Sequence, residues 1–120
     1  MNDRVLYFLM LLLSLCACRS AKLSEAEEKQ RIGEYYEAAA IYRKVYTKTS
    51  PQKRDLRGYI AFRMAECNRL INNTGKATSG YMNAIRYDYP DSIVYLRLAQ
   101  MQHKAGAYAE AIKNYDIYSE

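Results

Sequence analysis

Two side chains of this chain belong to types that catalyse reactions or bind metals, and both lack the neighbours that such chemistry requires. His103 is the only histidine, and no cysteine or second histidine lies four residues from it. Because metal sites need several ligands, we expect a surface or groove histidine and no metal site. Cys67 lies near Met64 and Leu70 and is typical of a small core residue. The spacing permits a Cys67–His103 catalytic pair, but no motif supports one, so we predict no catalytic residue, no cofactor and no enzyme.

The first part of the chain has the composition of an export signal. Residues 2–4 contain one base and precede an apolar run, 5–15, that only Ser14 interrupts. Eleven residues rise only about 16 Å as a helix, roughly half of a bilayer core. We therefore expect a signal sequence rather than a stable membrane span.

The apolar run ends in Leu15-Cys16-Ala17-Cys18, which resembles the bacterial lipoprotein box. That box has a leucine three residues before the modified cysteine and small residues directly before it. Cys16 fits less well, because Leu15 would then occupy a position that must be small. The resemblance implies that a signal peptide, 1–17, is removed and that Cys18 is acylated, which anchors the chain durably. An ordinary secretory signal with incidental cysteines is the alternative.

The residues after Cys18 favour the outer membrane. Arg19 follows, rather than an acidic residue, and no stretch rich in Asp or Glu comes next. By resemblance to lipoprotein sorting signals, we expect a lipid-anchored protein that faces the periplasm. The net charge of +5 is spread among acids, and only Lys53, Arg54 and Arg57 cluster. Since no basic stripe or nucleic-acid motif is present, we expect no nucleic-acid partner.

One spacing pattern occurs three times along the main body of the chain. An alanine is followed twelve residues later by a second alanine and after four more by a tyrosine. The copies are 39 and 34 residues apart, and 34 residues is a helix–turn–helix repeat length. Small residues let two helices approach closely, and tyrosine adds apolar area with a polar tip. We predict an all-α fold in which these residues pack the helices: Ala26, Ala38, Tyr42, Ala65, Ala77, Tyr81, Ala99, Ala111 and Tyr115.

Turn signals recur in the same register. Gly33, Asn72 and Gly106 occupy one repeat position, and these residue types tolerate the left-handed conformation that often ends a helix. Asp91 or Ser92 can cap the helix that follows it. We predict six helices, over 24–31, 35–48, 54–70, 75–87, 92–104 and 108–119.

The sequences GEYYEA (33–38) and GAYAEA (106–111) resemble the G-x-Y-x-E-A turn of tetratricopeptide (TPR) repeats. Pro51 and Pro90 match the terminal proline of that family. The second repeat is five residues longer than 34, and we expect a longer loop or a longer helix between Pro51 and Ala65. The resemblance implies a solenoid of about three repeats, 24–51, 52–90 and 91–120, after a lipidated N-terminus and short spacer at 18–23.

The first helices of TPR repeats line a concave face that binds helices or extended peptides. Carried onto this chain by position, the resemblance implies a groove for a protein or peptide of the envelope, and no small-molecule substrate. An adjoining domain of the same polypeptide is the alternative occupant. The implied groove residues are Tyr59, Phe62, Glu66, Arg69, Leu70, Ile93, Leu96, Gln100, His103 and Lys104.

The order of lipoprotein box, spacer and tyrosine-rich repeats resembles the start of OmpA-family lipoproteins of the PorE type, which are linked to type IX secretion. This resemblance implies a docking scaffold in an outer-membrane or secretion assembly. We also expect the N-terminal part of a longer protein, because Tyr115, Ile117 and Tyr118 would otherwise face water. A subunit of the β-barrel assembly machinery and an accessory domain of an envelope enzyme are the alternatives.

Overall fold

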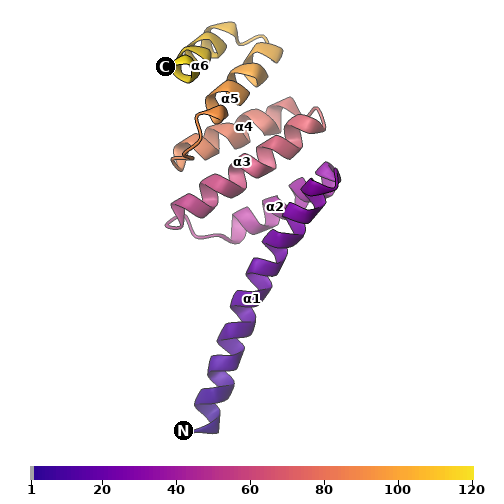
Figure 1. Ribbon diagram of the computed structural model, residues 1–120, viewed down its shortest axis with the longest axis vertical. Helices are drawn as coiled ribbons and strands as arrows, with labels where there is room; N and C mark the ends of the chain where they lie inside the picture. Colours follow the sequence, from indigo (N-terminus) through magenta and orange to yellow (C-terminus); the bar gives the residue numbers. More distant parts are fainter. Residues whose placement is uncertain (1) are drawn as a thin grey trace.

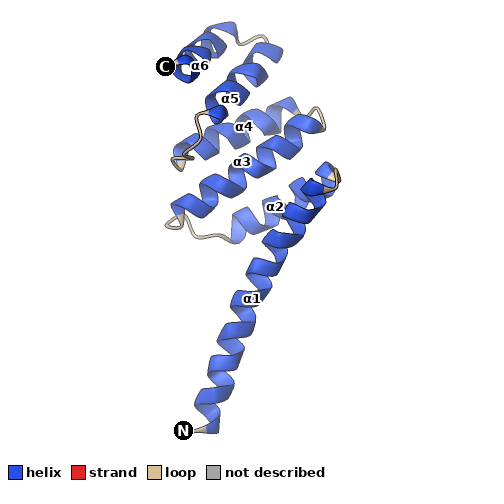
Figure 2. Cartoon of the chain, viewed as in Figure 1, coloured by secondary structure: helices blue, strands red, loops and turns tan. Residues whose placement is uncertain are grey.

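The described residues form α-helices joined by short turns, without a strand (Figures 1 and 2). The computed structural model describes the backbone of residues 2–120 and the side chains of 2–11 and 22–120. The side chain of Cys18, the predicted lipidation site, therefore lies outside the described residues. The predicted all-α class is confirmed. The helices are α1 (Asp3–Arg31), α2 (Tyr35–Lys48), α3 (Arg54–Leu70), α4 (Thr74–Arg86), α5 (Ile93–Lys104) and α6 (Tyr108–Ser119).

Each helix packs chiefly against its neighbours in the chain, from α1 on α2 to α5 on α6. The result is a stack of helices, and the chain with the projecting half of α1 measures 64 × 28 × 18 Å. In Figure 1, α1, α3 and α5 lie toward the viewer, α2 and α4 lie behind α3, and the first half of α1 extends away from the other helices. Alternate helices thus form alternate faces of the stack.

The helix boundaries follow the local sequence signals closely, except at the N-terminus. The predictions for α2, α3 and α6 are matched to the residue, α4 begins and ends one residue earlier than predicted, and α5 begins one residue later. The first helix begins at Asp3 instead of residue 24. Residues 18–23, expected to be a spacer, contain no glycine or proline that would end a helix, and α1 therefore continues through them.

The second repeat contains its extra residues in a helix rather than a loop. α3 begins eleven residues before Ala65, whereas α5 begins six residues before Ala99. The longer α3 therefore accounts for all five additional residues. Of the two predicted arrangements, the N-terminal extension of the helix is correct.

The predicted left-handed residues are confirmed. The φ angles of Gly33, Asn72 and Gly106 are 84°, 61° and 81°. Asp88 is also left-handed, with φ of 58°, and no repeat pattern predicted it. At the start of α5, Asp91 Oδ1 accepts a hydrogen bond from the backbone N–H of Ile93 at 2.9 Å, so Asp91 rather than Ser92 supplies the capping side chain.

Two groups of buried residues form the core, and the half-buried Tyr46 packs against both. The first group lies among α1, α2 and α3 and contains Ala26, Ala38, Ala39, Tyr42, Ile60 and Cys67. The second lies among α3, α4 and α5 and contains Ala61, Phe62, Ala65, Ala77, Tyr81, Ala84, Val94, Leu98 and Met101.

The nine residues that the spacing pattern selected are buried with one exception. Tyr115 is half-buried, and Ala99 and Ala111 are buried outside the two groups. The closest approach between helices involves a residue that the pattern missed. A Cβ atom on Gly80 of α4 would lie 2.7 Å from the Cβ of Ala65 in α3. No side chain other than hydrogen fits between these two helices.

We expect Gly80→Ala to destabilise the fold by about 1–3 kcal/mol, because the new methyl group overpacks the contact with Ala65. In a domain of this size, each kcal/mol lowers the melting temperature by about 4–8 °C. Gly75→Ala is the matched control: it lies in the same helix, with no atom within 4 Å of the added Cβ. Thermal unfolding followed by circular dichroism should show a lower midpoint for Gly80→Ala alone. Equal midpoints for the two variants would contradict the close approach.

Candidate functional site

Side chains from α1, α3 and α5 meet along one side of the stack. The Tyr59 hydroxyl of α3 donates a hydrogen bond to Glu27 Oε2 of α1 at 3.1 Å. Arg97 Nε of α5 lies 3.4 Å from Glu66 Oε1 of α3. These contacts join helices that are not neighbours in the chain. We call the surface around them the α1/α3/α5 face.

Glu66 is the centre of a polar cluster on this face. Its side chain is only 16% exposed, and its carboxylate lies 3.0 Å from Arg69 Nη2 as well as near Arg97. The Tyr81 hydroxyl donates a hydrogen bond to the same carboxylate. Burial raises the pKa of Glu66, but hydrogen bonds from Arg69 and Tyr81 and the positive charges outweigh it and hold the pKa below its ordinary value. The cluster therefore keeps Glu66 ionised.

Arg97 is held less completely than Arg69 in this cluster. Its Nε is buried and makes no hydrogen bond of good geometry among the described residues, although it lies within ion-pair distance of Glu66. Its Nη1 donates to Gln100 Oε1 at 3.2 Å. Arg97 thus shares one carboxylate with Arg69 instead of forming a two-bond pair of its own.

A related contact recurs one repeat earlier. The Tyr42 hydroxyl donates to Gln30 Oε1 at 2.9 Å and accepts from Arg63 Nε at 3.4 Å. Burial raises the pKa of Tyr42 to about 12, so its hydroxyl remains protonated. Arg63 stands two residues before Ala65, as Arg97 stands two residues before Ala99. Neither arginine was among the predicted site residues, although their shared register is visible in the sequence.

Several predicted groove residues are occupied by contacts within the protein. Phe62 is buried and stacks on the ring of Tyr89, with 4.3 Å between ring centroids. Glu66 is held in the polar cluster with Arg69. Tyr59, Ile93, Leu96 and Gln100 are half-buried, and Ile93 packs against the second core group.

The exposed members of the predicted groove lie at the C-terminal ends of α3 and α5. Leu70 is the last residue of α3, and its side chain is 42% exposed. Lys104 Nζ donates to Asn72 Oδ1 in the α3–α4 turn at 3.2 Å. His103 packs its ring edge-on against Tyr108, with 5.4 Å between centroids, so it contributes to the α5–α6 contact.

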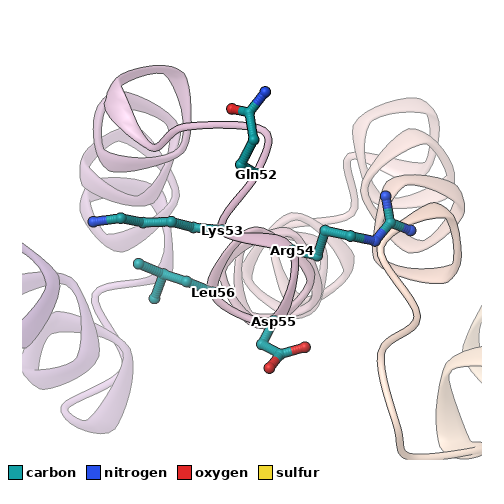
Figure 3. A pocket seen from close by; sticks show the side chains of 5 residues that line it. All are labelled: Gln52, Lys53, Arg54, Asp55 and Leu56. Carbon is teal, nitrogen blue, oxygen red and sulfur yellow. The ribbon is translucent and has the colours of Figure 1, made fainter.

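A shallow hollow lies at the start of α3, away from the predicted groove residues (Figure 3). Five consecutive residues line it, and their side chains spread in different directions around the end of the helix. They are Gln52, Lys53, Arg54, Asp55 and Leu56, of which only Leu56 is half-buried.

The basic residues near this hollow have structural partners. Arg54 Nη2 donates to the carbonyl of Arg86 at 2.7 Å and pairs with Asp88 Oδ2 at 2.9 Å. Arg57 Nη1 donates to the carbonyl of Thr49 at 2.6 Å, and its guanidinium lies 4.0 Å from the ring centroid of Tyr46. Both arginines join α3 to the ends of α2 and α4, so these two members of the basic cluster have structural roles.

The structure does not bring Cys67 and His103 together. Cys67 is buried in the first core group, whereas His103 contacts α6. Burial raises the pKa of the Cys67 thiol to about 11, so the reactive thiolate is scarce at neutral pH. Within the described part of the chain, no three His, Cys, Asp or Glu side chains lie where they could hold a metal ion. Nor does any helix there combine the length and apolarity needed to cross a membrane.

No protein-family model matches this chain, and no curated protein matches it closely enough to indicate a relationship.

We expect Glu66→Gln to destabilise the fold by about 1–3 kcal/mol at neutral pH, because two partly buried arginines lose their anionic partner. Since the folded-state pKa of Glu66 lies below its ordinary value of 4.5, the stabilisation is present above that value. It is lost as the pH falls through the folded pKa. The variant should therefore show a shallower loss of stability below about pH 4.5.

Denaturant unfolding from pH 2.5 to 7 measures this difference. Glu28→Gln is the control, because Glu28 pairs with Arg31 on the exposed surface of α1, where solvent screens the interaction. If the free energy of unfolding falls with decreasing pH in the same way for Glu66→Gln and Glu28→Gln, the Glu66 cluster does not stabilise the fold.

Proposed function

We propose that this chain is a lipid-anchored, TPR-like scaffold of the bacterial envelope that binds protein partners. The observation that carries the proposal is the succession of a lipoprotein-type sequence, Leu15 to Cys18, and a stack of helices whose contacts recur at the repeat interval. Repeat stacks of this kind build extended binding surfaces.

The packing of the stack supports the TPR-like assignment. The alanines at the two repeat positions are buried in every repeat, with relative exposures of 0–2%. Gly33, Asn72 and Gly106 end the first helix of successive pairs in the same left-handed conformation. Tyr42 and Tyr81 are both fully buried, and each contacts polar groups of the α1/α3/α5 face. The buried alanines, the tyrosines and the left-handed turn residues thus all recur at equivalent positions of one repeat.

The N-terminal segment supports removal of the leader. The described apolar side chains of residues 5–11 are all exposed, and α1 contributes Ala26 to the first core group, with Leu23 packed against that group. Cleavage before Cys18 would retain these packing residues and discard an apolar run that water solvates poorly. Acyl chains on Cys18 would then hold the N-terminal end of the stack at the membrane surface.

The α1/α3/α5 face supports protein binding as the activity. It combines half-buried tyrosines with Arg63, Arg69 and Arg97, and aromatic and arginine side chains are enriched where proteins bind one another. A partner helix or extended peptide could contact both the aromatic and the charged groups. We place this scaffold at the periplasmic side of the outer membrane, in an assembly of the type IX secretion kind.

We expect Cys18→Ala to release the protein from the membrane, because the change removes the acylated thiol. Membrane fractionation and mass spectrometry of the mature N-terminus measure the anchor directly. Cys16→Ala is the matched control and should leave both acylation and membrane association unchanged. Tight membrane association of Cys18→Ala without an acyl group would contradict the anchoring proposal.

We expect Leu70→Asp to reduce partner capture by affinity purification from membranes, because a charge then stands among the predicted groove residues. Met82→Asp on α4 is the control, since Met82 is also exposed, at 52% against 42% for Leu70, but lies on another helix. Quantitative mass spectrometry should show partners that Leu70→Asp loses and Met82→Asp retains. Equal loss in both variants would argue against a specific face.

A further inference from the structure

The outward sides of α2 and α4 carry exposed basic residues that are scattered in the sequence. Both helices lie behind α3 in Figure 1. On each helix, exposed residues recur at three- and four-residue spacing along the side opposite a buried tyrosine, Tyr42 on α2 and Tyr81 on α4. We call these two outward sides the α2/α4 strip. Its basic residues are Arg43, Lys44, Lys48, Lys76 and Arg86.

The positive charge of the α2/α4 strip is not neutralised within the described part of the chain. None of its five bases forms an ion pair there. The two helices contain one acid, Glu37, and its charge acts on Lys29 of α1. The acids of the adjoining turns have other partners, since Glu34 pairs with Lys29 and Asp88 pairs with Arg54. The five bases are therefore available to an external anion.

This availability distinguishes the strip from the α1/α3/α5 face. On that face Arg69 and Arg97 share the carboxylate of Glu66, and Arg63 donates to the Tyr42 hydroxyl. An external anion there must compete with groups that the fold already supplies. On the strip it meets exposed bases without such competition, so long-range attraction of a polyanion is favoured.

Two large side chains with apolar surface stand among the bases. Tyr36 on α2 is 73% exposed, and Met82 on α4 is 52% exposed. Tyr36 precedes Lys44 by eight residues and Met82 precedes Arg86 by four, so each lies on the same side of its helix as that base. Tyrosine beside basic residues is typical of a surface at the headgroup level of a bilayer, where the ring enters the interface.

A bilayer also suits the wide distribution of these bases over two helices. Anionic headgroups move laterally, so they can meet five separated bases at once without a fixed spacing of acids. An acidic protein would need carboxylates placed to match each base. Attraction to an anionic leaflet increases with every lysine or arginine near its surface.

We infer that the α2/α4 strip binds the anionic phospholipid headgroups of a bilayer and lays the stack on the membrane. The inference goes beyond protein binding and rests on the proposed function only for a membrane held close to the chain. An anchor raises the effective concentration of headgroups around the strip, so a weak attraction is sufficient. The α1/α3/α5 face, on the opposite side of the stack, then stays open to a partner.

The test uses a tryptophan reporter, because the chain contains no tryptophan. Ser79→Trp places an indole on the exposed strip of α4, and Leu70→Trp places one at the exposed end of α3 as the control. The full chain with Cys16→Ala is coupled through Cys18 to a maleimide lipid, and the buried Cys67 does not compete.

The vesicles contain phosphatidylcholine with or without phosphatidylglycerol, and brominated lipids in both quench an indole that reaches the bilayer. For Ser79→Trp we expect blue-shifted, quenched emission in the anionic vesicles only. About 1 M salt should abolish both changes, because screening then acts within about 3 Å. Leu70→Trp should show neither change in either vesicle.

Two lysines provide matched charge reversals in the Ser79→Trp chain. Lys44 lies on the strip, whereas Lys104 lies at the end of α5, and both are exposed. Lys44→Glu should lower the ratio of docked to undocked strip by about fivefold or more, since each base near an anionic surface contributes about that factor. Lys104→Glu changes the net charge equally and should lower the ratio by less than about twofold.

Three results would overturn the inference. The first is emission of Ser79→Trp that is the same in anionic and neutral vesicles, and the second is an equal effect of Lys44→Glu and Lys104→Glu. The third is a shift of the Ser79→Trp emission by a soluble oligo-glutamate peptide but not by phosphatidylglycerol, which would make an acidic protein the partner. The maleimide lipid supplies the tether, so failure here is distinguishable from failure of Cys18 acylation.

Discussion

The approach of α4 to α3 at Gly80 and Ala65 is the constraint on which the rest of the stack depends. Because a Cβ on Gly80 would lie 2.7 Å from that of Ala65, these helices touch almost backbone to backbone. At that separation Tyr81, the next residue, reaches across α3 and places its hydroxyl at Glu66. A wider spacing would withdraw the hydroxyl and leave a buried polar group without a partner. The small residues therefore determine the polar chemistry as well as the packing.

Burial of tyrosine hydroxyls in turn explains why the α1/α3/α5 face is charged. Each buried hydroxyl needs an acceptor, which Gln30 supplies for Tyr42 and Glu66 supplies for Tyr81. A partly buried carboxylate then needs cations, and Arg69 and Arg97 meet that requirement. The arginines of this face thus have a structural origin, and their half-exposed groups are what a partner would encounter.

Local signals predicted the helices well, because capping, turn and spacing residues act within a few positions of the chain. The left-handed Gly33, Asn72 and Gly106 are examples. Contacts between helices were less predictable, since they depend on which side chains of distant residues face one another. The spacing pattern missed Gly80 for this reason, whereas the shared register of Arg63 and Arg97 was visible but did not reveal their partners. Conversely, Phe62 was predicted to line a groove, but stacking on Tyr89 buries it in the core.

The internal ion pairs of the α1/α3/α5 face set a free-energy cost for any ligand that would bind there. On the α1/α3/α5 face, a ligand must compete with the existing pair between Glu66 and Arg97, and it must desolvate charges that are already satisfied. A partner on this face would therefore be selected mainly through the penalty for a wrongly placed charge.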